Sequence, residues 1–344
     1  MSASTSPKPQ PLDTKTPLVL RLRRLTGSQA VLTAGTLAVV MVFFSVLFPS
    51  KFPTLYNIQT LAVDYSGIVL LGVGLTFIMT SARFDLSVGA VLVFSCVMGV
   101  KAMELLGGGA GGWGAVLLGL AACLTTGLLS GFVNGFLIVK ARVPSIIVTL
   151  GTLSIAQGAA YVLTSGVDLY GVPKPMLDQI GQGRVLGLPI PVLVALVAVL
   201  VGAFVLSQTR FGQYACAIGS NAEAARRAGI NIDRVAITLY LISGSGAGLA
   251  GFMSLARFGS TTLAAHQGDN LTALLGVVLG GTSLFGGTGT VIGTAVGVFI
   301  PGVLSNGLVM MQVLPYWQYI VVGVVLIGVV YIDLVKRRGR TEGG

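Results

Sequence analysis

Few residues in this chain have the types and spacing that catalysis requires. His266 is the single histidine among 344 residues, and Asp269 stands three positions after it. One histidine cannot form H-E-x-x-H, and we expect that no Ser/His/Asp arrangement can be built around it, because it falls outside the apolar runs. Cys96, Cys123 and Cys216 show neither metal-ligand nor disulfide spacing. The sequence therefore predicts no catalytic residue and no metal site, and it argues against an enzyme.

The glycine-rich segment at residues 280–290 reads GGTSLFGGTGT. It lacks the lysine of the G-x-x-x-x-G-K-[ST] motif, so it does not predict a phosphate-binding loop. In apolar surroundings, glycines favour close helix packing or a break in a helix that lines a cavity. We expect no cofactor in this chain, and ATP in particular would have to be bound by a different subunit.

The composition predicts an all-α polytopic membrane protein. Hydrophobic residues make up 54% of the chain and charged residues 9%, against about a quarter in soluble domains. Apolar runs near the ~20 residues that cross a bilayer recur along the chain, and the 49 glycines favour a transporter or channel with broken or tightly packed helices. About ten spans are expected, the eighth and ninth being full or re-entrant, at residues 29–48, 58–80, 87–105, 113–138, 144–164, 189–208, 235–257, 270–285, 289–311 and 316–335.

The distribution of basic residues predicts that both termini are cytoplasmic. With the N-terminus inside, 16 of the 21 Lys and Arg residues fall on the cytoplasmic side, which is the bias that membrane insertion favours. This location explains the net charge of +10 without a nucleic-acid partner. We expect a disordered cytoplasmic tail at 1–27, a transmembrane domain at 28–335 and a cytoplasmic tail at 336–344. The longest external loop, 165–188, is either a docking surface or a plain connector.

A basic, polar stretch at residues 209–234 interrupts the apolar sequence. Ser220 and Glu223 have the S-x-x-E spacing of a capping box, and Gly229 stands where a left-handed C-terminal cap belongs. The stretch therefore predicts a short capped helix on the cytoplasmic side, available to a soluble partner. The alternative is an ordinary solvated loop.

Polar residues inside the apolar runs are few, so proton or ion coupling is not indicated. Arg83 and Asp85 are expected to pair near the inner interface. Candidates for a translocation path are polar residues at membrane depth, which could equally form hydrogen bonds between helices: Asp64, Asn134, Gln157 and Asn306.

Five motifs in order resemble membrane permease subunits of ABC importers of the ribose/xylose/autoinducer-2 type. They span about residues 54–334: GVGLTFIMT (72–80) followed by Asp85, Leu86, Ser87, Val88 and Gly89; Val133-Asn134-Gly135; PSIIVTLGT (144–152); residues 219–230 of the basic stretch; and VVLGGTSLFGGTGTVIGT (277–294) followed by Asn306-Gly307-Leu308. The chain departs from the family at Ala82-Arg83-Phe84, where Gly-Gly-Ile is usual.

The resemblance implies a permease in the bacterial cytoplasmic (inner) membrane that imports a monosaccharide or similar solute. Its expected partners are cytoplasmic ABC ATPase subunits, a second permease copy or paralogue, an extracytoplasmic solute-binding protein and membrane lipid. Alternatives are an ABC permease for nucleosides or branched-chain amino acids, or a sugar facilitator that needs no partner.

The resemblance also assigns the ATPase-coupling element to the basic stretch. Gly219 and Gly229 are expected to delimit its helix, and Ala225 to pack in a groove of the ATPase. Asn221 and Arg226 would bond across the interface, and Glu223 belongs to the same loop.

Overall fold

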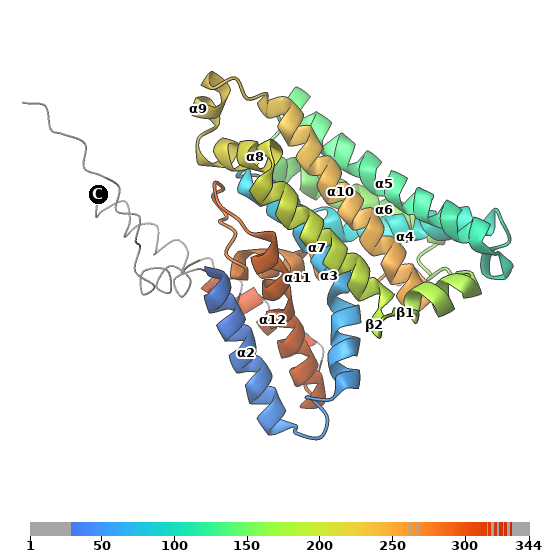
Figure 1. Cartoon of the computed structure of the whole chain (residues 1–344). Helices are drawn as coiled ribbons and strands as arrows, with labels where there is room; N and C mark the ends of the chain where they lie inside the picture. The colour runs from blue at the N-terminus through green and yellow to red at the C-terminus, as the bar shows by residue number, and fades with distance from the viewer. Residues whose placement is uncertain are drawn as a thin grey trace, which may run out of the picture.

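The apolar runs of the sequence fold into α-helices that lie side by side (Figure 1). The computed structural model describes residues 29–314 except Thr262 and Gln267, and a subset of positions between 316 and 331. The predicted tails at 1–27 and 336–344 lie outside the described residues, as does half of the tenth predicted span. In chain order the elements are α2 (Gln29–Leu47), α3 (Leu55–Thr80), α4 (Val88–Glu104), η1 (Gly108–Ala110), α5 (Trp113–Lys140), α6 (Ser145–Thr164), η2 (Met176–Gly181), β1 (Arg184–Val185), β2 (Leu188–Pro189), α7 (Ile190–Gln208), α8 (Arg210–Ser220), α9 (Ala222–Arg227), α10 (Ile232–Phe258), α11 (Asp269–Leu279) and α12 (Val291–Met310).

The described part of the chain contains six helices long and apolar enough to cross a membrane, which are α3, α5, α6, α7, α10 and α12. The segment Val31–Leu47 of α2 and helix α11 are shorter apolar helices. The predicted all-α polytopic membrane protein is therefore confirmed. Nine of the ten predicted spans overlap a helix, since apolar runs of this length must satisfy their backbone groups internally in lipid.

Helix α3 lies at the centre of the bundle, where it packs against α7, α10, α11 and α12. Helices α5 and α10 form the most extensive pair, and glycines bring their backbones together. A Cβ at Gly127 of α5 would overlap the carbonyl oxygen of Gly244 in α10, and one at Gly131 would overlap that of Tyr240. Small residues at a crossing let membrane helices approach closely, and here they lock α10 to α5.

Helix α11 is shorter than the predicted eighth span at 270–285, because it ends at Leu279. Eleven residues rise about 16 Å, about half of a ~30 Å hydrocarbon core. Residues 280–290 then run without helix, and Gly281, Gly286 and Gly287 adopt positive φ. The eighth span is therefore wrong as a full crossing, and the glycine-rich segment forms a backbone break before α12.

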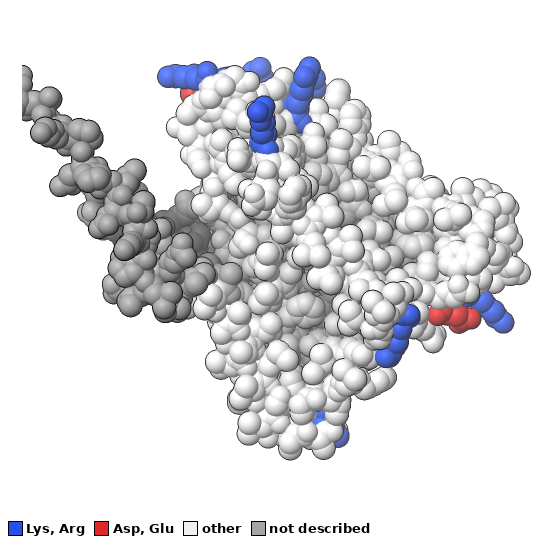
Figure 2. Space-filling model, viewed as in Figure 1, with Lys and Arg blue, Asp and Glu red and all other residues white. Residues whose placement is uncertain are grey.

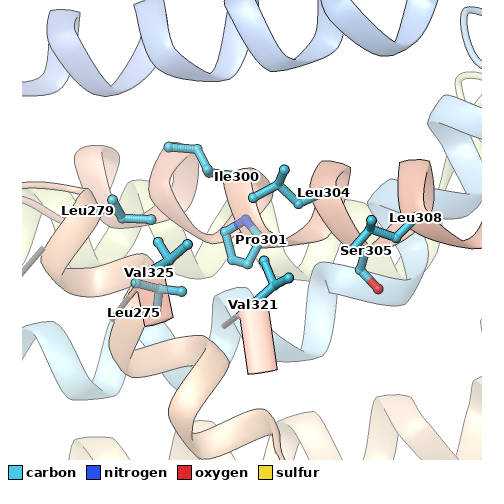
Figure 3. A pocket seen from close by; sticks show the side chains of 9 residues that line it. All are labelled: Leu275, Leu279, Ile300, Pro301, Leu304, Ser305, Leu308, Val321 and Val325. Atoms are coloured by element: carbon cyan, nitrogen blue, oxygen red, sulfur yellow. The ribbon is translucent and has the colours of Figure 1, made fainter. Parts of the chain in front are cut away.

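A small apolar cavity of about 20 Å³ lies beside α11 and α12 (Figure 3). Helix α12 contains Pro301, whose ring lines this cavity between Ile300 and Leu304. Ser305 supplies the one hydroxyl among the nine lining residues. A cavity this small and this apolar has no room for a polar solute.

The predicted external loop at 165–188 is folded rather than loose. The β1–β2 hairpin pairs Val185 with Leu188, and Leu186 and Gly187 between them both have positive φ, as in a two-residue primed turn. The Asp168 carboxylate accepts hydrogen bonds from the Leu263 amide at 2.7 Å and the Thr261 hydroxyl at 3.3 Å. The loop is thus tied to the segment that follows α10.

Candidate coupling site

The basic stretch folds into two short helices, α8 and α9, at one end of the bundle (Figure 1). The Thr209 hydroxyl caps α8 by accepting from the Gly212 amide at 3.4 Å, and the Asn221 side chain caps α9 by accepting from Ala224 at 2.9 Å. The predicted capping box is therefore wrong. Ser220 still belongs to α8, where its hydroxyl donates to the Cys216 carbonyl, and Glu223 pairs with Arg227 at 3.2 Å instead.

The C-terminal end of α9 has the predicted left-handed glycine. Gly229 has φ of 83°, its amide donates to the Arg226 carbonyl, and the Ile230 amide donates to the Ala225 carbonyl, both near 3.0 Å. This pair of bonds is the Schellman motif, which satisfies carbonyls that would otherwise lack partners. Gly229 therefore delimits the helix as expected.

The surface of α9 is basic and exposed. Figure 2 shows Lys and Arg side chains gathered over the α8–α9 end, whereas the middle of this face is free of charge. Glu223, Ala224, Arg226 and Arg227 are exposed. Ala225 is only 4% exposed and packs in the chain's own core. This position faces inward, so its expected packing in a groove of a partner would require α9 to move away from the core.

Gly219 joins α8 to the core instead of ending the helix. It lies one residue before the end of α8, and a Cβ there would overlap the carbonyl oxygen of Thr80, the last residue of α3. The same Thr80 carbonyl accepts from the Gly287 amide at 2.9 Å. The end of α8, the end of α3 and the glycine-rich segment therefore meet at one point.

Asp85 organises the connection between α3 and α4. Its buried carboxylate accepts from the Ser87 amide at 3.0 Å, the Ser87 hydroxyl at 2.6 Å and the Ser243 hydroxyl of α10 at 2.9 Å. Burial raises the pKa of Asp85, whereas these hydrogen bonds act in the opposite direction. The expected ion pair with Arg83 is wrong, because serine hydroxyls and an amide surround the carboxylate. Burial lowers the pKa of Arg83.

This network extends into two more helices. Asn134 of α5 donates to the Ser87 hydroxyl at 3.0 Å and accepts from the Thr152 hydroxyl of α6. Leu86 has a backbone carbonyl that accepts from the Asn270 side chain of α11 at 3.3 Å. The motif residues Asp85, Leu86 and Ser87 therefore tie α10, α5 and α11 to one connection, which begins five residues after Thr80.

Gly89 lies in the first turn of α4 and completes the motif. A Cβ at Gly89 would lie 3.3 Å from the backbone nitrogen of Asn270, so a larger residue would press on the start of α11. The motif thus also sets the approach of α4 to α11.

The candidates for a translocation path separate into two kinds. Asp64 forms an ion pair with Arg257 at 2.9 Å, and Asn306 exchanges two amide hydrogen bonds with Asn57. Together with Asn134, these residues bond between helices, as the alternative interpretation allowed. Gln157 differs, because it lines a cavity of about 260 Å³ between α4, α6 and the start of α11.

The expectation that His266 forms no Ser/His/Asp arrangement is wrong, because its ring lies between a serine and an aspartate. One ring nitrogen lies 2.7 Å from the Ser254 hydroxyl, and the other lies 2.7 Å from the Asp269 carboxylate. The arrangement arises because His266, which follows α10 in the chain, contacts Ser254 near the C-terminal end of that helix. It joins α10 to α11, and Ser254 lies on α10 with little exposure.

Two residues of this site escaped prediction. Thr80 closes the motif at 72–80 and could have been singled out by its place there, although its carbonyl, not its side chain, makes the junction. Ser243 lies 158 positions from Asp85, and nothing in its local sequence indicates the contact.

Comparison with known proteins places this geometry in a family of transport permeases. A family model described as a branched-chain amino acid transport system / permease component matches residues 57–330. The chain is 35% identical over 304 residues to the ribose import permease protein RbsC of Escherichia coli (strain K12), covering 88% of this chain and 92% of that protein. It is 34% identical to the D-allose transport system permease protein AlsC of the same organism over 86% of this chain and 89% of that protein. The fructose import permease protein FrcC of Rhizobium meliloti is 31% identical, with 90% of this chain and 86% of that protein covered. These matches confirm the resemblance inferred from the motifs, and the chain belongs to this family of multi-pass permease components of transport systems.

Proposed function

We propose that this chain is the membrane permease of an ATP-driven, binding-protein-dependent importer for a monosaccharide or similar polyhydroxylated solute. The observation that carries the proposal is the pair of capped helices α8 and α9, exposed and basic on one side and fixed to Thr80 and Gly287 on the other. A cytoplasmic ATPase subunit that binds α8 and α9 would be connected rigidly to the helix bundle, so that its movement would displace the membrane helices. ATP is bound by that subunit, and this chain needs no cofactor of its own.

The contacts suggest how force applied to α9 reaches the membrane helices. Movement of α8 displaces the end of α3 through Gly219 and Thr80, which touch backbone to backbone. The connection after Thr80 holds α10 through Ser243 and α5 through Asn134. A rigid-body displacement at α8 therefore shifts several helices together, which is the kind of motion that alternating access requires.

The membrane arrangement follows from the charge pattern and the helices. About ten spans with both termini cytoplasmic would place α8 and α9 inside and the β1–β2 hairpin outside. The hairpin and η2 would then face an extracytoplasmic binding protein, and a second permease copy or paralogue would complete the pathway. The surrounding bilayer is the bacterial inner membrane.

The cargo class rests on the relatives. The similar permeases named above import ribose, allose and fructose, whereas the family description names branched-chain amino acids. We favour a sugar because the individual relatives cover nearly the whole chain. A branched-chain amino acid is the second candidate.

Affinity purification of the tagged chain in mild detergent, followed by mass spectrometry, tests the proposal. We expect recovery of an ATPase with a phosphate-binding loop. Arg226→Glu on the exposed face of α9 should reduce that recovery at least tenfold. Lys51→Glu makes the same reversal of charge in the exposed turn after α2 and should leave the recovery unchanged. Equal recovery with both variants would show that α9 is not where the ATPase binds.

A further inference from the structure

The cavity that Gln157 lines is larger and more polar than the small cavity beside α11 and α12. It lies between the first turns of α4, the C-terminal half of α6 and the start of α11, and its volume is about 260 Å³. Small-molecule sites in proteins run from roughly 300 to 1,000 Å³, so this cavity is near the lower limit and suits a solute of monosaccharide size. The cavity beside α12 is about 20 Å³ and almost wholly apolar.

Four residues bring polar groups to the lining of the cavity, and no Asp, Glu, Lys or Arg among the described residues lines it. Gln157 and Tyr161 project from α6, His266 and Asn270 come from the α10–α11 side, and the rest are glycine, alanine, valine and leucine. A zwitterion in such a site would lose the hydration of both charges without gaining an opposite charge, which is costly. A neutral solute with many hydroxyl groups avoids the cost of burying charge, although its buried hydroxyls need hydrogen bonds from the lining or from water.

The polar groups differ in what they still offer a ligand. Both ring nitrogens of His266 are engaged, by Ser254 and Asp269. The Asn270 amide is held by the Leu86 carbonyl. The Gln157 amide makes no hydrogen bond within the described part of the chain, and it carries two donors and one acceptor. It is therefore the group best able to bind a hydroxyl.

The base of the cavity is connected to the coupling site. Gly89 and Asn270 meet there, and Asn270 is bonded to Leu86, which stands between Asp85 and Ser87. The connection from Thr80 to α4 thus contacts one residue of the cavity wall, Asn270, through Leu86. A shift at the α8 junction would change the shape of the cavity.

We propose that this cavity is a transient binding site for the solute inside the permease. A neutral polyhydroxylated molecule of monosaccharide size would hydrogen-bond to the Gln157 amide, with the Tyr161 ring against its C–H face. The proposal deepens the proposed function and rests on it. Because a single amide is available, binding is weak, as passage requires.

Uptake by the reconstituted complex tests the site. Proteoliposomes are prepared with the wild-type chain, its ATPase and its binding protein. The uptake rate is then measured for D-ribose, D-allose, D-fructose and L-leucine. Gln157→Leu should lower the maximal uptake rate of the transported sugar at least tenfold, because the amide is lost. The sugar concentration at half-maximal rate should stay unchanged, since the binding protein sets it. Ser154→Leu is the matched control, since Ser154 lies on α6 outside the cavity and is exposed.

A second readout measures occupancy without transport. Gln157→Cys in a Cys216→Ser background should react with a small thiol reagent, because Cys96 and Cys123 are buried. Saturating sugar should slow this reaction several-fold. Unchanged labelling, or equal uptake by Gln157→Leu and Ser154→Leu while wild type imports sugar, would overturn the cavity proposal alone. Import of L-leucine in place of any sugar would overturn both this proposal and the proposed cargo.

Discussion

Replacement of Gly219 by alanine is the perturbation that most directly tests the mechanical link between α8 and the membrane helices. A Cβ at this position would overlap the Thr80 carbonyl oxygen and lie 2.6 Å from the Gly287 nitrogen, whereas ordinary contact begins at 3.4 Å. Backbone atoms occupy both sides, so no side chain can rotate away. Either α8 must move off the end of α3, or the Gly287–Thr80 hydrogen bond must open.

The size of the effect follows from these contacts. Overpacking of this kind costs about 1–3 kcal/mol, and a lost backbone hydrogen bond adds about 1 kcal/mol. If the junction transmits the ATPase motion, a loss of about 2 kcal/mol in its stability corresponds to a fall in coupled transport of more than tenfold. Gly219→Val should abolish coupling.

The assay is ATP hydrolysis and solute uptake by the reconstituted complex, compared as solute moved per ATP. Gly35→Ala in α2 is the control, because a Cβ there meets nothing within 4 Å. We expect Gly35→Ala to behave as wild type and Gly219→Ala to hydrolyse ATP with little transport. Unchanged transport per ATP in Gly219→Ala would refute the assignment of this junction.

Three further substitutions test the neighbouring contacts. Asp85→Ala leaves three donors without their acceptor and should lower the stability of the detergent-solubilised chain by about 2–3 kcal/mol. Asp85→Asn should lower the stability less, because its amide oxygen still accepts a hydrogen bond. Equal losses of stability in thermal unfolding would contradict the hydrogen-bonding role. Asn221→Ala removes the cap of α9, which should destabilise that helix by about 1 kcal/mol and reduce recovery of the ATPase a few-fold. Asn221→Asp keeps a capping side chain and should restore the recovery. Equal recovery with both variants would argue against an ordered α9. Ala225→Glu buries a charge and should reduce the yield of folded chain in size-exclusion chromatography, whereas Ala224→Glu on the exposed face should not; the same yield for both would show that Ala225 does not face inward.

The sequence predicts those parts of the fold that depend on local composition. Apolar runs near 20 residues mark the membrane helices, because length and hydropathy alone decide whether a segment can cross a bilayer. Gly229 was identifiable because few residues other than glycine accept a left-handed backbone at a helix end. The break after α11 was one of two alternatives that the sequence left open, and the position of the helix end at Leu279 was not predicted.

The parts that depend on distant residues could not be read from the sequence. Ser220 and Asn221 are both good N-caps, and what decides between them is that α8 continues through Ser220 to place Gly219 on Thr80. Asp85 is bonded by Ser87 and by Ser243 of α10, and Asn134 of α5 reaches this network only through the Ser87 hydroxyl. The pairing with Arg83 was predicted because the two residues are close in sequence. The Ser254–His266–Asp269 contacts likewise need the chain to fold back after α10.

The most direct test of the central claim is solute uptake into proteoliposomes with and without the ATPase that co-purifies with this chain. The complex should accumulate solute only when the ATPase and ATP are both present, and Arg226→Glu should reduce uptake to the level without the ATPase. Uptake at the same rate by the chain alone would contradict the account, because a facilitator has no need of α8 and α9.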